Sequence, residues 1–362
     1  SDTIAGWCGE HGIAMTGHYM SEPTLYSQTL RLGEAMRCYR NQQIPGVDIL
    51  CGDPEYSTVK QAVSVARQKG REAVICELYG VTNWDFDFKG HKVQGDWLAA
   101  LGVTVRCHHL SFMSMEGEAK RDWPASINYQ SPWYGKYSYI ENYFARVNTA
   151  LTRGKADVKV GVIHPIESYW ISYGPVAQTQ DIRDQLDLEY KELMEFLLFG
   201  MIDFDLISES LLGGKDGAAA CPYPRRDRER QRPEFRVGEM SYRTILVPGL
   251  RTIRSSTLEK LEQFAAAGGN IIFAGRIPQL VDALPSQRAA ELAAGSKVIS
   301  FDRREILAAL DSDRSVEIRR MDGRLTDDLF YQMREDGGTK WLFVRHVNQK
   351  KTRLDQAQEL LV

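Results

Sequence analysis

The stretch AVICELYG, residues 73–80, runs four apolar residues directly into Glu77 and closes with Tyr79 and Gly80. An ionised carboxylate is costly to remove from water unless a partner pairs with it or a reaction uses it. The apolar run therefore predicts a buried β-strand, and the glutamate predicts the point where burial ends and a pocket begins. The alternative is a glutamate that caps a helix or forms an ion pair at the strand end.

Three similar apolar runs flank this stretch, at residues 12–20, 45–50 and 103–109. Helical patterns lie between the runs, at residues 24–42, 57–70 and 92–102. The runs are nearly continuous rather than alternating, which is typical of a parallel sheet covered on both faces. Repeated strand–helix units of this length predict a (β/α) barrel or a doubly wound sheet.

The regular pattern stops after residue 109. The segment 110–143 is rich in Trp, Tyr and Pro, and long loops inside a compact domain are usually functional. A helical pattern over residues 140–154 then closes this first region. We expect residues 1–155 to be the C-terminal part of a (β/α) TIM-type barrel that carries the active site.

A second α/β pattern follows, with strands expected at 158–165, 204–210, 243–250 and 270–275 and helices expected at 187–203 and 255–269. This alternation predicts a flavodoxin-like open parallel sheet over residues 156–296. Residues 297–362 are expected to form a short β-rich tail, possibly the start of a further domain, with a hairpin that turns at Asp336, Gly337 and Gly338.

Composition excludes several classes of protein. Of the 362 residues, 43% are hydrophobic and 26% are charged, which is typical of a globular chain. The net charge of −3, without a basic block, argues against nucleic acid, and no apolar run approaches the ~20 residues that span a bilayer. Six cysteines without CxxC spacing favour a reducing, cytoplasmic compartment over a disulfide framework or a zinc site. No metal and no cofactor is expected.

The predicted strand ends deliver polar groups to one place, because all strands of a (β/α) barrel point their carboxyl ends to the same face. In chain order these groups are His18 and Tyr19 with Glu22, then Asp48, then Glu77 with Tyr79, then His108 and His109. Any one of them has a structural explanation; Ser21 and Glu22, for example, also suit the start of a helix. Four successive strand ends together favour a functional site.

Two carboxylates facing each other across a pocket are what glycosidic cleavage needs. One carboxyl group with a raised pKa protonates the leaving oxygen, and the other attacks the sugar or activates water. Glu77 is the candidate base or nucleophile, and Glu22 is the in-chain candidate acid. The expected substrate-binding residues are His18, Tyr19, Asp48, Tyr79, Trp84, His108 and Trp123, whereas Trp97 lies in a helical pattern and is expected in the core.

Several of these motifs resemble large multidomain glycoside hydrolases. The motifs are CELYGVTNWDF at a strand end, the helix DWLAALGV, the strand end CHHLSFMS, GEAKRDWPASINYQSPWY and ENYFARVNTALTRG. The resemblance is to α-L-rhamnosidase-like barrel enzymes, and ILVPGL with LEKLEQFAAAGGNIIFAG is similar to the domain that follows the barrel in these enzymes and in barrel β-galactosidases. It implies that Glu77 is the base or nucleophile on the seventh barrel strand, and that an oligosaccharide or glycoside of plant or microbial origin is the substrate.

One departure from the barrel pattern is the number of units. Only four strand–helix units precede the second domain, so the first half of an eight-stranded barrel is missing, and we expect the chain to begin inside a larger protein. The resemblance places the acid/base glutamate at the end of the fourth strand, upstream of Ser1, in which case Glu22 binds substrate instead. A half barrel exposes its core face and its sheet edges, so the isolated chain is expected to pair with itself or to lack activity.

Other functions have less support. An amidotransferase-like hydrolase needs a nucleophilic cysteine at a strand-to-helix turn, but Cys221, the only cysteine of the second region, lies in a Pro- and Arg-rich connection. A dinucleotide site needs a glycine-rich turn after the first strand, where Pro165 and bulky residues stand. Metal ligation by both His108 and His109 is disfavoured, because adjacent strand residues point to opposite faces. A carbohydrate-binding or assembly module with the same fold but no turnover remains the alternative.

Overall fold

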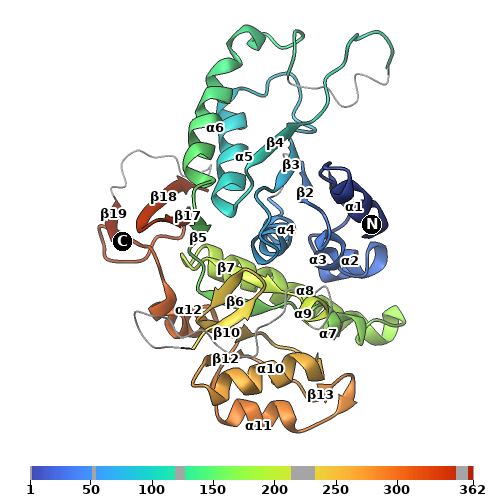
Figure 1. Cartoon of the computed structure of the whole chain (residues 1–362), viewed down its shortest axis with the longest axis vertical. Coiled ribbons are helices and arrows are strands. Elements are labelled where there is room, and N and C mark those ends of the chain that lie inside the picture. Colours follow the sequence, from blue (N-terminus) through green and yellow to red (C-terminus); the bar gives the residue numbers. More distant parts are fainter. Residues whose placement is uncertain (1, 51–53, 119–126, 213–232, 348–357, 362) are drawn as a thin grey trace.

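The computed structural model describes residues 2–50, 54–118, 127–212, 233–347 and 358–361. Its elements are arranged along one long axis (Figure 1), with the first sheet and its helices towards one end and a second parallel sheet towards the other. Both sheets are built from parallel strands joined through helices. Both of these regions are therefore α/β, as the sequence predicts.

The first sheet has four parallel strands in the order β1-β2-β3-β4. The strands are β1 (Thr16–Gly17), β2 (Ile44–Ile49), β3 (Ile75–Leu78) and β4 (Val105–His108). The helices are α1 (Asp2–Glu10), α2 (Leu25–Arg31), α3 (Ala35–Tyr39), α4 (Tyr56–Gln68), α5 (Phe88–Leu101) and α6 (Ser138–Leu151), with a short 3-10 turn η2 (Tyr134–Lys136) before α6. This succession of adjacent parallel strands is a partial (β/α) barrel.

Only one face of this sheet is covered by the described residues. In β3, Cys76 and Leu78 are buried, whereas Ile75 and Glu77 are partly exposed. Their neighbours on β4, Val105 and Cys107, are exposed. The expectation of a sheet covered on both faces is therefore wrong for these four strands. The physical reason is that the helices lie on one side, while the face that carries Glu77 meets no second layer among the described residues.

The helical pattern at 24–42 forms two helices instead of one. α2 ends before Gly33, whose φ of 79° is left-handed and breaks the helical path. Glu34 then has an extended backbone and precedes α3. The interruption turns α3 back towards α4, against which it packs.

The second sheet has five parallel strands in the order β15-β12-β10-β6-β7. The strands are β6 (Val160–Ile163), β7 (Phe204–Ile207), β10 (Thr244–Val247), β12 (Asn270–Ala274) and β15 (Lys297–Ile299). Counted along the chain, this is the order 2-1-3-4-5, the order of flavodoxin-like sheets. β15 pairs with β12, so the sheet continues past residue 296, where we expected the tail to begin.

Helices cover both faces of the five-stranded sheet. They are α7 (Ile166–Trp170), α8 (Val176–Leu198), α9 (Glu209–Leu212), α10 (Ser255–Ala266), α11 (Arg288–Ala294) and α12 (Arg303–Ala309). Short strands lie in the connections: β8 (Phe235–Val237), β9 (Met240–Tyr242), β11 (Thr252–Ile253), β13 (Leu280–Val281) and β14 (Leu284–Pro285). No described helix, not even the 23-residue α8, has an apolar stretch long enough to cross a membrane.

The two sheets share one hydrophobic core. Residues of α4 and β3 belong to the same buried cluster as residues of α8 and of one face of the five-stranded sheet, such as Val162 and Leu246. The other face of that sheet packs against α10 in a separate cluster that includes Ile245 and Phe273. α4 contacts both β2 and β7, so it lies between the two sheets and is buried along most of its length.

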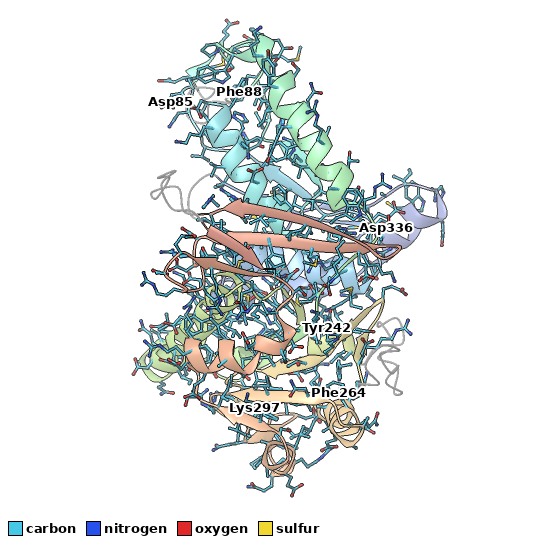
Figure 2. All side chains as sticks on the ribbon, turned by 90° about the vertical axis from the view of Figure 1, so that its left-hand side faces the viewer. Asp85, Phe88, Tyr242, Phe264, Lys297 and Asp336 are labelled. Carbon is cyan, nitrogen blue, oxygen red and sulfur yellow. The ribbon has the colours of Figure 1, made fainter. Side chains whose placement is uncertain are left out.

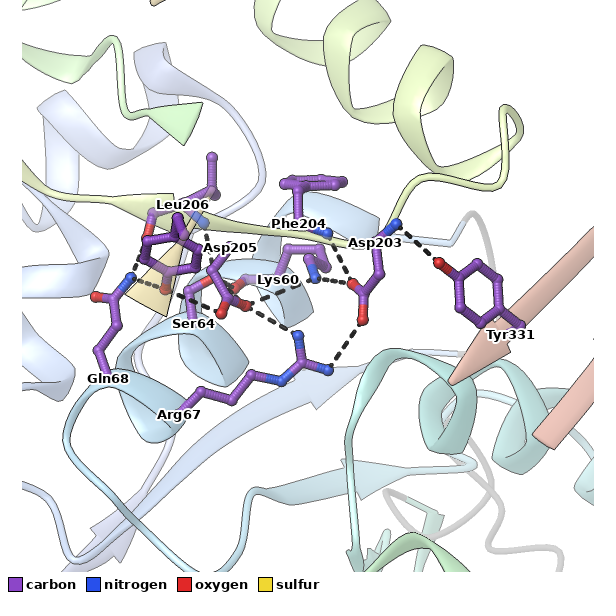
Figure 3. A network of polar contacts seen from close by, with 10 residues as sticks. Lys60, Ser64, Arg67, Gln68, Asp203, Phe204, Asp205, Leu206 and Tyr331 are labelled. Carbon is purple, nitrogen blue, oxygen red and sulfur yellow. Dashed lines mark hydrogen bonds and ion pairs between the residues drawn. The ribbon is translucent and has the colours of Figure 1, made fainter. Parts of the chain in front are cut away.

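A buried polar network crosses the same boundary (Figure 3). The Lys60 ammonium of α4 donates to Asp203 at 2.9 Å, next to the start of β7, and Arg67 of α4 donates to Asp205 at 2.9 Å. Lys60 and Asp205 are fully buried. Burial raises the pKa of Asp203, but the charges of Lys60 and Arg67 outweigh it and leave that pKa below its ordinary value. The network joins the partial barrel to the second sheet through charged hydrogen bonds.

The last part of the chain forms a β hairpin between the two regions. β17 (Leu329–Asp336) pairs with β18 (Thr339–His346), and its end also pairs with β5 (Lys155–Ala156). Figure 2 shows Asp336, at the hairpin tip, between Phe88 of α5 and Lys297 of β15 along the long axis. The turn lies at Gly337 and Gly338, which both have positive φ, as predicted. The remaining elements are η3 (Asp311–Asp313), β16 (Glu317–Arg320) and β19 (Gln358–Leu361).

Candidate active site

The register of the first sheet brings Asp48 and Glu77 side by side. They are direct partners in the parallel pairing of β2 and β3, and Cys107 is the partner of Glu77 on β4. Paired residues in adjacent strands point to the same face. All three therefore lie on the open face, where the side chains of Asp48 and Glu77 are 34% and 32% exposed.

His18 completes the group from the segment that follows β1. Its Nε2 lies 3.4 Å from Glu77 Oε2 and 4.0 Å from Asp48 Oδ2. Its Nδ1 lies 2.9 Å from the carbonyl oxygen of Tyr19, which accepts hydrogen bonds only, so Nδ1 carries a proton. The ring is thereby oriented with Nε2 towards the two carboxylates.

A close approach of strands positions this histidine. A Cβ on Gly46 would lie 2.6 Å from the carbonyl oxygen of Gly17, too close for any side chain. Glycine at this place lets β1 pair with β2 and sets His18 beside the strand ends. The sequence analysis did not single out Gly46.

Gln94 of α5 ties the ends of β2 and β3 together behind the site. Its Nε2 donates to the carbonyl oxygen of Ile49 at 2.9 Å, and its Oε1 accepts from the amide of Tyr79 at 3.1 Å. Ile49 is one residue from Asp48, and Tyr79 is two residues from Glu77. A buried glutamine in a helix gives no local pattern that would have predicted this role.

The turn after β3 is strained. Tyr79, Val81 and Asn83 all have φ between 59° and 70°, a region that non-glycine residues enter rarely. Each such residue costs of order 1–3 kcal/mol and persists only where the surroundings impose it. Here the buried Tyr79 hydroxyl donates to the carbonyl oxygen of His91 at 3.1 Å. Strained backbone of this kind clusters at functional sites, and this turn begins two residues after Glu77.

Burial changes the acidity of the carboxyl groups at the site. Burial, and then the charge of Glu77, raise the pKa of Asp48, and His18 and His109 partly oppose the rise. Burial likewise raises the pKa of Glu55. The Thr58 hydroxyl, which donates to Glu55 at 2.9 Å, partly opposes this rise, and the charges of Glu22 and Asp48 add to it. Glu55 stands just before α4 and was not predicted from the sequence.

Glu22 lies below the surface and is not part of the exposed group. Its side chain is 4% exposed, and Oε1 accepts from the Tyr39 hydroxyl at 3.2 Å. Burial raises the pKa of Glu22. The Glu22 carbonyl oxygen also accepts from Gln28 and Gln61, which fix this segment against α2 and α4.

The other predicted residues are distributed around this centre. Tyr19 donates its hydroxyl to the Cys38 carbonyl at 3.0 Å, and Tyr79 is buried against the ring of His91. Trp84 is partly buried in the turn before α5. Trp123 lies outside the described residues. The structure therefore brings together His18, Asp48 and Glu77, with Glu22 buried nearby.

His108 and His109 point to different sides, as alternation requires. His108 is the partner of Leu78 and faces the helices, where its Nε2 lies 3.3 Å from Glu141 of α6. Burial lowers the pKa of His108 to about 4. His109 instead lies against Gly80, and its charge lowers the pKa of Asp48. The histidine on the side of the open face is therefore His109.

The exposed group allows two kinds of chemistry. His18, Asp48 and Glu77 each offer one ligand atom, and these atoms lie within 4.8 Å of one another. One imidazole and two carboxylates suit a divalent cation. Two adjacent carboxyl groups, one of them with a raised pKa, also suit acid–base hydrolysis. Among the described residues Glu77 forms no ion pair with Lys or Arg; its ion-pair partner is His18.

Comparison with known proteins gives structural matches only. No family model matches the chain, and no curated protein does. The rhamnosidase from Novosphingobium sp. PP1Y has a TM-score of 0.63 at 17% identity, over 93% of this chain and 32% of the rhamnosidase. An exo-carrageenase GH42 from Bacteroides ovatus has a TM-score of 0.52 at 11% identity, over 85% of this chain and 42% of that enzyme.

The chain therefore spans less than half the length of either enzyme. At these identities the likeness establishes the fold. The resemblance inferred from the sequence is confirmed at that level: the chain has the fold of a part of barrel glycoside hydrolases, a partial (β/α) barrel followed by an open parallel sheet.

Proposed function

We propose that the protein hydrolyses a glycosidic bond at the open face of its four-stranded sheet. The observation that carries the proposal is the in-register pair of Asp48 and Glu77, half-exposed and oriented towards His18. The fold shared with a rhamnosidase and an exo-carrageenase supports a carbohydrate substrate.

In this proposal Glu77 is the nucleophile and Asp48 is the acid/base. Asp48 replaces Glu22 in the role of acid, because Glu22 is buried and Asp48 combines exposure with a raised pKa. Asp48 gives its proton to the leaving oxygen while the Glu77 carboxylate bonds to the anomeric carbon. Water then attacks that carbon, its proton returns to Asp48, and the bond to Glu77 breaks.

The spacing supports retention of configuration. The ligand atoms of the two carboxyl groups lie within 4.8 Å. Retaining enzymes hold their carboxyl groups roughly 5–5.5 Å apart, and inverting enzymes leave roughly 6.5–9.5 Å for a water molecule. This upper limit on the nearest approach of the two carboxylates is closer to the retaining spacing than to the inverting one.

The test is hydrolysis of aryl α-L-rhamnosides and β-D-galactosides by the wild-type protein, Glu77→Gln and a control, Glu72→Gln. Glu72 is an exposed glutamate just before β3. Glu77→Gln is expected to lower kcat by about 10³-fold or more, with ligand affinity largely kept, while Glu72→Gln keeps wild-type rates. A carbohydrate-binding module would bind these glycosides without any turnover in the wild-type protein.

Repeating the assay with a chelator distinguishes acid–base catalysis from metal binding by His18, Asp48 and Glu77. Activity that persists in EDTA supports the acid–base pair. Activity lost in EDTA and restored by Ca²⁺ or Zn²⁺ would assign His18, Asp48 and Glu77 to a metal ion instead.

A further inference from the structure

A second pocket opens at the carboxyl edge of the five-stranded sheet, far along the chain from the candidate active site. Its volume is about 630 Å³. The polar residues that line it include Ser172, Tyr173, Gln178, Thr179, Arg251 and Arg276. They come from the segment after β6, from the first turn of α8, and from the loops after β10 and β12.

The pocket lies where the chain order of the sheet reverses. β6 and β10 are neighbours, but the chain continues from β6 outward to β7 and from β10 in the opposite direction to β12 and β15. In open α/β sheets this switch point leaves a crevice outside the strand ends, and ligands bind there. The position of the pocket is therefore that of a ligand site by topology alone.

Arg251 is held in place at the pocket by two serines. Its Nη1 donates to the Ser172 hydroxyl at 2.7 Å, and its backbone amide donates to the Ser168 hydroxyl at 2.9 Å. The remaining guanidinium N–H groups have no carboxylate partner among the described residues. A planar guanidinium fixed at one nitrogen keeps a free edge that suits bidentate binding of an oxyanion.

Arg276 brings a second guanidinium to the same pocket from the loop after β12. It is exposed, and its single side-chain contact in the described part of the chain is a long one of 3.5 Å to the Gly249 carbonyl. The acidic group next to this loop is Glu189, near Gly249, and its carboxylate accepts from Gln185 rather than from either arginine. Two positive charges that have no carboxylate partner in the described part of the chain therefore meet in one pocket, where a bound anion would compensate them.

The other lining groups fit this charge. Gln178 and Thr179 lie in the first turn of the 23-residue helix α8; their own amides donate to the Pro175 carbonyl, and the dipole of the helix gives this end a partial positive charge. Tyr173 adds a half-exposed ring, and the Arg183 guanidinium lies 5.2 Å from its centre.

We propose that this pocket binds a small ligand through an oxyanion, a phosphate, sulfate or carboxylate group, held between Arg251 and Arg276. The proposal does not depend on hydrolysis at Glu77, because no residue of the pocket belongs to the first sheet.

The test is calorimetric titration of the whole protein with inorganic phosphate, inorganic sulfate and acetate, at an ionic strength held constant with NaCl. At least one of the three is expected to bind with a millimolar or lower Kd. Arg276→Gln is expected to weaken that binding at least tenfold, and the double variant with Arg251→Gln to abolish it. Tetrahedral anions binding and acetate not binding would indicate a phosphate or sulfate ligand, and the reverse would indicate a carboxylate; either result supports the proposal.

Two controls keep the outcome clear. Arg304→Gln removes an exposed arginine on α12 that lies outside the pocket, and wild-type affinity is expected. Arg251→Lys keeps the positive charge but removes the paired N–H donors of the guanidinium, so intermediate affinity is expected if the bidentate contact matters. The proposal is overturned if no anion binds to the wild-type protein under these conditions, or if the folded Arg276→Gln and double variants bind as tightly as the wild type.

Discussion

The two parallel sheets differ in how their faces are covered. β6, β7 and β10 are buried at every residue, between α8 on one side and α10 on the other. β3 alternates between buried and half-buried residues, and β4 has no buried residue. The fully covered sheet has apolar side chains on both faces. On the sheet with an open face, Asp48 and Glu77 lie on that face in contact with water, where they are able to meet a substrate, whereas Arg106 and His108 face the helices.

The largest effect is expected for Asp48 on the open sheet. As a general acid Asp48 has to be protonated, so the rate is expected to fall as pH rises through its raised pKa. Asp48→Asn is expected to lower kcat/KM by about 10²–10⁴-fold and to remove this alkaline fall. The measurement is the pH profile of aryl glycoside hydrolysis. A variant that keeps the alkaline fall would show that another group is the acid.

The next effect concerns the junction between the sheets. Lys60→Met leaves Asp203 and Asp205 buried with Arg67 as their remaining cation, and the loss of one partner of a buried ion pair costs about 3–5 kcal/mol. The free energy of unfolding, from urea titration, is expected to fall by that amount. Lys89→Met, at an exposed position on α5, serves as the control and is expected to change it by less than about 0.5 kcal/mol. Equal effects of both variants would mean that the network does not join the regions energetically.

A matched pair of valines compares the sheets directly. Val247 on β10 is fully buried, and Val105 on β4 is 38% exposed on the open face. Val247→Ala is expected to cost about 2–3 kcal/mol, from two lost methyl groups and the cavity they leave. Val105→Ala is expected to cost less than about 0.5 kcal/mol. A large loss at Val105 would instead mean that the open face is covered in solution, for example by a second copy of the chain.

Much of the fold follows from local sequence pattern. The strands at Glu77, the helices that end at Gly70 and Gly102, and the hairpin turn at Gly337 were all predictable, because apolar runs and glycine positions are local signals. The open face was not predictable from the apolar pattern; only the count of four strand–helix units, which leaves the core face of a half barrel exposed, indicated it. An apolar residue such as Val105 has the same sequence signature whether or not a second layer covers it.

The candidate site was predictable only in part. Asp48 and Glu77 ended their strands in the sequence, and parallel pairing made them neighbours. The distinction between His108 and His109 depends on a single residue of strand register, which sequence does not determine. Gln94 lies on a helix that is distant in the chain from the strand end it supports. The Lys60–Asp203 pair joins residues 143 positions apart, so no window of sequence contains both.

A buried carboxyl group at the end of the covered sheet, on α9, gives the smallest effect and the last comparison with Glu77. Glu209 follows β7, is 3% exposed, and accepts from the Arg254 amide at 2.8 Å. Burial raises its pKa to about 8 in the folded protein. An unfolded chain loses this proton near pH 4.3, so between that pH and 8 the unfolded state binds fewer protons than the folded state.

Stability should therefore fall as pH rises through this window, by up to about 1.4 kcal/mol per pH unit, and level off above pH 8. His164, whose pKa burial lowers to about 3, acts in the opposite direction, since its contribution is lost as pH falls from about 6.5 towards 3. Urea titrations between pH 7 and 8 avoid this second group, because His164 is then neutral in both states. Glu209→Gln is expected to flatten the slope in this range, whereas Glu259→Gln, at an exposed position on α10, should leave it unchanged. An unaltered slope in Glu209→Gln would show that this carboxyl group ionises in the folded protein below pH 7, and that burial in the covered sheet does not keep it neutral.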